Sequence, residues 1–252
     1  MRTFLSGAFG FHLPLRVVTA LSKKYNRVLA LGIPELDKVF LGLQGGDFVI
    51  LVGRLVCTWL SSLLSVRGQL PLKKGGLNSC VVYLDGGNTF DPYAVSAIAR
   101  EYGLEPKPTL ERVMISRAFT AHQLTALIFE KLEETLGEYK SKLVVVSDII
   151  GLFLDRDVPQ TEGRDVFLKM THYLTEVASK RHAVVVASYV PRPDSRRALF
   201  LESVLLGRAR VVIRVIGSRN GFKFALEGHP NIESFTLDLA SDAVTIDMYM
   251  EA

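Results

Sequence analysis

Short, continuous runs of apolar residues recur along the chain, and most are followed by a longer stretch with a helical pattern. The run at 48–52 is bounded by glycines, which is typical of a strand buried on both faces of a parallel sheet. Similar short runs predict four further strands, at 79–84, 112–116, 143–146 and 183–189.

The stretches between these runs predict helices at 58–66, 91–102, 121–139 and 165–178. Asp91 is suited to cap the second helix, and Pro92 to its first turn. Alternating apolar and polar residues predict smaller edge strands at 209–216, 222–226 and 234–239. Strands that alternate with helices are joined by right-handed crossovers. The sequence therefore predicts an α/β fold, with helices on both faces of a mostly parallel sheet and smaller antiparallel strands at its C-terminal end.

The composition fits one globular domain. A chain of 252 residues that is 48% apolar can bury one large core. We expect an N-terminal arm at 1–26 and a single core domain at 27–252. The apolar runs are too short to cross a bilayer as a helix, so we expect a cytoplasmic protein that has no membrane partner. Cys57 and Cys80 lack the spacing of metal ligands, and we interpret them as two buried thiols.

The charge is unevenly distributed. The whole chain carries a formal charge of +4, whereas 190–219 holds seven arginines against Asp194 and Glu202, a local charge of +5. From Glu227 to the end there are six acidic residues and no lysine or arginine. This asymmetry predicts one face that attracts phosphates and another that repels them.

Five segments, in the same order along the chain, resemble RecA, RadA and KaiC proteins. One of them, Tyr83-Leu-Asp-Gly-Gly-Asn-Thr-Phe90, is similar to the RadA strand end Tyr-Ile-Asp-Thr-Glu-Gly-Thr-Phe. The other four lie at 32–40, 97–106, 117–124 and 224–230. The resemblance extends over about residues 27–240. It implies a RecA-like fold of the phosphate-loop type, and a RadA- or RadB-like paralogue or a KaiC-like protein.

A phosphate loop needs glycines whose backbone amides surround the phosphates, a lysine for the outer phosphates and a hydroxyl for magnesium. Aligned with the GxxxxGKT pattern, the chain keeps Gly53, whereas Thr58, Trp59 and Leu60 replace the second glycine, the lysine and the hydroxyl. Trp59 has two interpretations. Its ring fills the phosphate space, or it is an ordinary core aromatic at the start of a helix.

The resemblance implies that other catalytic positions are substituted too. Gly87 corresponds to the family's catalytic glutamate, and Tyr189 to its sensor glutamine. The family's magnesium-associated aspartate corresponds to Ser147, with a carboxylate one residue later at Asp148. Since these groups act as a unit, we expect no ATP hydrolysis, no catalytic residues, no bound metal and no ATP cofactor.

The resemblance also suggests where DNA would bind, because the recombinases hold DNA in two loops after their fourth and fifth strands. In the second loop, at 191–198, the phosphate-contact candidates are Arg192, Arg196 and Arg197. The first loop, 154–163, carries three acids against one arginine, which makes it a poor DNA surface. Arg208, Arg210 and Arg214 are expected to share one face of a strand and to pair with the acidic C-terminal segment of this chain or of a neighbouring one.

The N-terminal arm holds three phenylalanines, Phe4, Phe9 and Phe11, in an apolar stretch interrupted by glycines. In RadA-like proteins a Phe-containing segment before the core adds to a neighbouring subunit's sheet. The arm is therefore a candidate docking segment, and packing on its own domain is the alternative.

The first hypothesis is an inactive RecA/RadA paralogue, a homo- or hetero-oligomer that acts in recombination and repair by binding single-stranded DNA or a recombinase. The alternatives are a KaiC-like scaffold or peptide-binding module without a DNA role, and a divergent ATPase.

Overall fold

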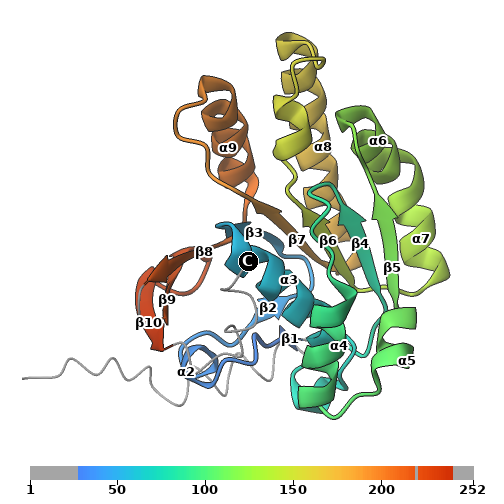
Figure 1. Cartoon of the computed structure of the whole chain (residues 1–252), viewed down its shortest axis with the longest axis vertical. Coiled ribbons are helices and arrows are strands. Elements are labelled where there is room, and N and C mark those ends of the chain that lie inside the picture. Colours follow the sequence, from blue (N-terminus) through green and yellow to red (C-terminus); the bar gives the residue numbers. More distant parts are fainter. Residues whose placement is uncertain (1–27, 219–220, 241–252) are drawn as a thin grey trace, which may run out of the picture.

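The structure, a computed structural model of the chain, describes residues 28–218 and 221–240. The candidate docking residues Phe4, Phe9 and Phe11 lie outside the described residues. A sheet of eight strands runs through the molecule in the order β10-β9-β8-β3-β7-β6-β4-β5 (Figure 1). The six strands from β8 to β5 are parallel, while β9 and β10 join antiparallel at one end. This arrangement confirms the predicted fold class.

The strands of the large sheet are β3 (Phe48–Val52), β4 (Val81–Asp85), β5 (Val113–Arg117), β6 (Leu143–Ser147), β7 (Val184–Tyr189), β8 (Val211–Ser218), β9 (Gly221–Gly228) and β10 (Phe235–Ala240). A small second sheet pairs β1 (Val28–Leu29) with β2 (Leu43–Gln44). The helices are α2 (Pro34–Asp37), α3 (Leu55–Arg67), α4 (Pro92–Glu101), α5 (Pro106–Glu111), α6 (Ala121–Ala126), α7 (Leu132–Glu138), α8 (Gln160–Arg181) and α9 (Arg196–Arg208). Short helical turns are η1 (Leu72–Lys74), η2 (Leu127–Lys131), which is a π-helical turn joining α6 to α7, and η3 (Gly151–Leu154).

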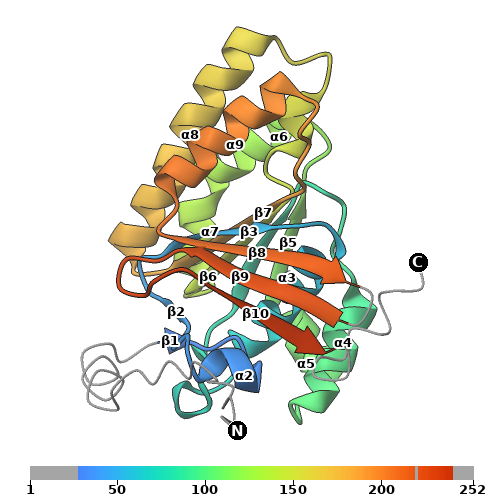
Figure 2. The ribbon, with the colours of Figure 1, turned by 90° about the vertical axis from the view of Figure 1, so that its left-hand side faces the viewer.

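Helices cover both faces of the sheet and enclose a core on each. In Figure 2, α6, α8 and α9 lie above the strands, and α4 and α5 lie below them. Helix α7 contributes to the same core as α6 and α8, and α3 to the same core as α4. Along β3, Val49 and Leu51 belong to the core beneath α3 and α4. Phe48, Ile50 and Val52 belong to the core on the opposite face. Because successive side chains of a strand point to opposite faces, a continuous apolar run serves both cores.

The segment before β3 is attached to the domain through Arg67, at the end of α3. This arginine is buried, donates from Nε to the carbonyl oxygen of Ala30 at 2.6 Å, and lies over the ring of Tyr102 at 5.2 Å. Asp37 accepts the backbone N–H groups of Leu31 and Gly32. The pKa of Asp37 is raised by burial, and the nearby guanidinium of Arg67 opposes that rise.

Two expectations about the arginine-rich segment are wrong. Arg196 and Arg197 are not loop residues, because Ser195 caps the helix α9 with its hydroxyl, which accepts the N–H of Ala198. The three arginines expected to share one strand face are also separated. Arg208 ends α9, and Arg210 precedes β8 and pairs with Asp47, so only Arg214 lies in the strand. Arg214 does pair with the acidic C-terminal segment, through Glu227 at 2.5 Å.

None of the helices in the described ranges is long and apolar enough to cross a membrane.

Candidate functional site

The parallel strands bring most of the predicted site residues to one edge of the sheet. In open α/β sheets, ligands bind outside the carboxyl ends of the strands. Val52, the last residue of β3, lies between Tyr189 of β7 and Arg214 of β8. Further along the same edge, Asp85 of β4 lies between Ser147 and Arg117. The positions predicted for a nucleotide site are therefore neighbours.

The connection between β3 and α3 consists of two residues, Gly53 and Arg54. Gly53 has a φ of +141°, and a Cβ atom there would lie 2.5 Å from the carbonyl oxygen of Val215. The close packing against β8 is therefore sufficient reason for a glycine at this position. A GxxxxGK[ST] loop, by contrast, places four residues between its two glycines before the lysine and the hydroxyl.

The three residues aligned with the rest of the phosphate motif lie within α3. Thr58 is half-buried, whereas Trp59 and Leu60 are buried. Trp59 keeps 5% of its surface exposed and belongs to the core between α3 and the sheet. Its position therefore agrees with the interpretation as a core aromatic. Cys57, one turn into the helix, is buried as well, and burial raises the pKa of its thiol to about 12.

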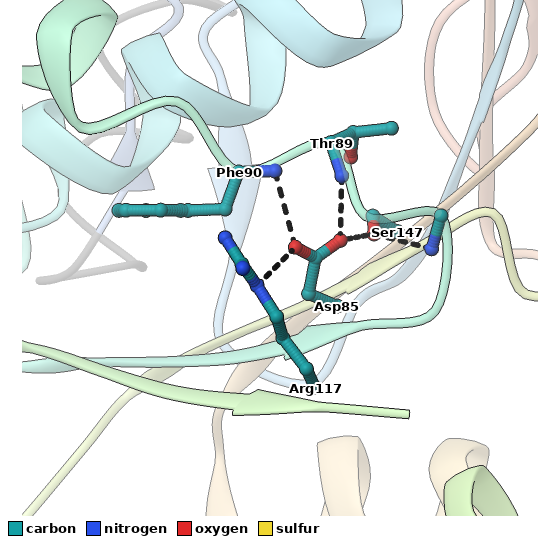
Figure 3. A network of polar contacts seen from close by, with 6 residues as sticks. Asp85, Thr89, Phe90, Arg117 and Ser147 are labelled. Carbon is teal, nitrogen blue, oxygen red and sulfur yellow. Dashed lines mark hydrogen bonds and ion pairs between the residues drawn. The ribbon is translucent and has the colours of Figure 1, made fainter. Parts of the chain in front are cut away.

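A fully buried carboxylate, that of Asp85, lies at this edge where β4 ends (Figure 3). Its Oδ1 accepts the N–H of Thr89 at 2.9 Å and the hydroxyl of Ser147 at 2.6 Å. Its Oδ2 accepts the N–H of Phe90 at 3.2 Å and pairs with Nε of Arg117 at 3.4 Å. Asp85 therefore fixes the turn that follows β4 and the ends of both neighbouring strands.

Gly87 lies inside this turn and has little free space beside it. Its N–H donates to the Ser147 hydroxyl at 3.2 Å. A Cβ atom at Gly87 would lie 2.9 Å from the Cβ of Asp148 and 3.0 Å from Cγ2 of Thr89. Any side chain at this position, a glutamate included, would require the turn or Asp148 to move.

Asp148 follows β6 with a φ of +44°, a left-handed conformation that is uncommon for a residue with a side chain. Asp148 is half-buried, and this partial burial raises the pKa of its carboxyl group. The nearby Arg192 and the backbone N–H groups of Gly151 and Val190 oppose this rise. Asp148 and Ser147 thus face different partners, as strand alternation predicts.

A second polar cluster lies beside the end of β3. The hydroxyl of Tyr189 donates to Glu202 of α9 at 2.5 Å, and burial together with this carboxylate raises the pKa of Tyr189. Arg214 donates to Glu227 at 2.5 Å, and this hydrogen bond raises the pKa of Arg214. Arg214, Glu202 and Glu227 beside the β3–α3 connection therefore already have polar partners, whereas Arg54 within the connection is exposed.

The three candidate DNA-contact arginines differ in exposure. Arg192 and Arg196 are exposed, whereas Arg197 is half-buried. The guanidinium of Arg197 donates to the backbone carbonyl oxygens of Asp155, at 3.4 Å, and Val158, at 3.0 Å. Arg192 and Arg196 are the members of the predicted set that face solvent.

The far end of the sheet is an exposed strand edge. Among the described residues β5 pairs with β4 alone. The carbonyl of Arg112 and the N–H of Ala118 bond toward β4, so by alternation the N–H and carbonyl of Ile115 point to the free edge. Ile115 is 41% exposed, and Phe119, just after the strand, is 68% exposed.

Comparison with known proteins identifies the family. The family model described as Rad51 matches residues 24–191, which is more than half of the chain. The chain belongs to the Rad51 family. It is also similar to the "DNA repair protein Rad51 homolog" of Drosophila melanogaster, with 35% identity over 129 residues. That alignment spans 50% of this chain and 38% of the fly protein. The predicted membership of the RecA/RadA superfamily is confirmed.

Sequence reasoning did not single out Asp85 and Arg117 in this Rad51-family chain. Both lie within the segments that resemble RadA proteins, but neither is a substituted catalytic position. The signal for Asp85 is a carboxylate at the end of a fully apolar run, where a buried charge requires partners. In the part of the chain that the structure describes, no group of three His, Cys, Asp or Glu side chains is arranged to hold a metal ion.

The substitution Asp85→Asn should lower the free energy of unfolding by about 3 kcal/mol. The neutral amide weakens several charge-assisted hydrogen bonds, and its NH2 group faces a neighbouring group that is itself a hydrogen-bond donor. Urea unfolding followed by circular dichroism measures the change. Asp91→Asn is the matched control. Asp91 caps α4 through the N–H groups of Tyr93 and Ala94, and asparagine caps equally well. Equal stabilities of the two variants would contradict a central role for the Asp85 carboxylate.

Proposed function

We propose that this Rad51-family chain is an accessory factor in DNA recombination and repair that does not hydrolyse ATP. The observation that carries this proposal is the two-residue connection between β3 and α3. A phosphate cradle works because several consecutive backbone amides surround the phosphates. Gly53 and Arg54 offer too little chain for that cradle, and the following helix begins at Leu55.

The surrounding residues do not fit a magnesium-bound triphosphate either. Arg214, the cation that lies beside the end of β3, is paired with Glu227. The position of the water-orienting glutamate is Gly87, where an added Cβ would meet Asp148 at 2.9 Å. Hydrolysis requires the cradle, the metal and the oriented water together, so the combined changes support loss of the whole activity.

The relation to a protein named as a DNA repair homologue supports a role in repair, in the cytoplasmic or nuclear compartment where DNA is available. Because the alignment covers 38% of that relative's length, activities of the whole relative remain proposals for this chain.

ATP should neither bind nor turn over. Trp59 is the single tryptophan of the chain and lies on the helix that follows the connection, so its fluorescence reports on this region. We expect no saturable change on titration with ATP and magnesium, and no phosphate release. Trp59→Lys should not create activity, because the cradle and the oriented water are still missing. Saturable binding, or turnover by this variant, would contradict the proposal.

Binding to a recombinase is supported by the free edge of β5. An exposed strand edge can accept an extended segment of another chain through main-chain hydrogen bonds. In the RadA-like proteins that this chain resembles, a Phe-containing segment adds to a neighbouring subunit's sheet. The outward N–H of Ile115 supplies a donor, and the exposed Ile115 and Phe119 supply apolar surface. We therefore propose β5 as the edge that receives a recombinase segment.

Ile115→Pro should abolish binding to a RadA- or Rad51-type recombinase in pull-down and calorimetric titration. Proline removes the outward donor, while the bonds between β5 and β4 use other residues. Ile115→Val keeps both the donor and an apolar side chain, and should bind within about twofold of the parent, since volume-conserving apolar changes cost little. Equal binding by the proline and valine variants would show that this edge is not the contact.

Single-stranded DNA is the second candidate partner, supported by the exposed Arg192 and Arg196. If they contact phosphates, affinity should fall steeply with salt, and Arg192→Ala with Arg196→Ala should reduce the logarithmic salt slope by about two. Fluorescence anisotropy of a labelled oligonucleotide at several salt concentrations measures both quantities. An unchanged slope would exclude these arginines. Absence of binding to both DNA and recombinase would favour the KaiC-like scaffold.

A further inference from the structure

The segments that follow β6 and β7 are joined by two arginines and one glycine. Besides its bonds to Asp155 and Val158, Arg197 buries its Nη2 atom against Gly163 in the first turns of α8. A Cβ atom at Gly163 would lie 2.9 Å from Nη2 and 3.0 Å from Cγ1 of Val158. The guanidinium thus occupies space that any other residue at 163 would take.

Arg164 makes a second link between the same helices. Its guanidinium lies over the ring of Phe200 in α9, 4.5 Å from the ring centroid. Arg164 therefore extends from α8 to α9, and Arg197 extends from α9 to the start of α8. No acidic side chain lies within salt-bridge distance of either arginine among the described residues. Carbonyl oxygens and an aromatic face therefore hold these two cations, which is a packing role rather than an ion pair.

We propose that Arg197 is a positioning residue that clasps the segment 155–163 onto the start of α9, and that Gly163 admits its guanidinium. The clasp joins the two segments that family resemblance assigns to DNA into one rigid unit. It also gives Arg197 a different task from its neighbour Arg196, which is exposed. This inference goes beyond the proposed function, because it concerns the free protein without DNA or a partner.

Hydrogen exchange followed by mass spectrometry tests the clasp in the isolated protein. In Arg197→Met, which keeps an apolar stem but no donors, peptides covering 155–163 should exchange about tenfold faster, as expected for loss of two hydrogen bonds that hold a local unit. Peptides covering β6 and β7 should be unchanged. Arg197→Lys keeps a donor at similar reach and should be intermediate. Arg196→Met, one residue earlier and exposed, is the control and should match the parent.

Gly163→Ala provides a second test that leaves Arg197 in place. The added methyl group should displace the guanidinium and open the same segment, whereas in the Arg197→Met background it should cause a smaller further opening, because only its contact with Val158 remains. Parent-like exchange in Arg197→Met would overturn the proposal. So would a uniform rise that includes β6 and β7, or equal effects of Gly163→Ala in the two backgrounds. None of these outcomes depends on whether the protein binds DNA or a recombinase.

Discussion

The close approach of Gly53 to the carbonyl oxygen of Val215 sets the geometry of the carboxyl edge of the sheet. The chain leaves β3 between two parallel neighbours and turns into α3 within two residues. A turn this short places the first residues of α3 directly against the sheet, and Cys57 and Trp59 are buried as a result. The same constraint leaves few backbone amides free to point at an anion.

The polar groups along this edge bond chiefly to one another. Asp85 takes hydrogen bonds from two amides and a hydroxyl and pairs with Arg117, while Glu202 and Glu227 take those of Tyr189 and Arg214. A buried carboxylate is stable only when such partners satisfy it. These carboxylates and the pairing of Arg117 and Arg214 support the proposal that the edge does not hold a triphosphate. The same interactions join β4 to β5 and β6, β8 to β9, and β7 to α9.

The sequence predicted β3, β4, β6 and β7 well, because each is an apolar run that is buried throughout. The segment expected as a smaller edge strand at 209–216 is instead β8, which lies inside the sheet, parallel to β3. The sequence predicted the cap of α4 for the same kind of local reason, since Asp91 accepts the N–H groups that the helix start leaves free. Helix α9 was missed because its first turn carries two arginines and follows a proline-rich stretch, a pattern that also fits a loop. Its deciding features are the Ser195 cap and the burial of Ala198, Leu201 and Leu205. The role of Asp85 depends on partners up to 62 positions away, and no local pattern contains them.

The two proposed functional regions, the β3–α3 connection and the free edge of β5, are far enough apart in the sheet for one to change without the other. In the strand order, β7, β6 and β4 separate β3 from β5. Changes in the β3–α3 connection therefore alter the chemistry at the carboxyl ends of the strands without removing the outward donor of Ile115. Main-chain hydrogen bonding at the β5 edge requires an ordered strand and nothing from a nucleotide. Under the proposed function, a RecA-like sheet loses its phosphate cradle and retains an edge that binds another chain, provided that the Asp85 network keeps β4 and β5 aligned.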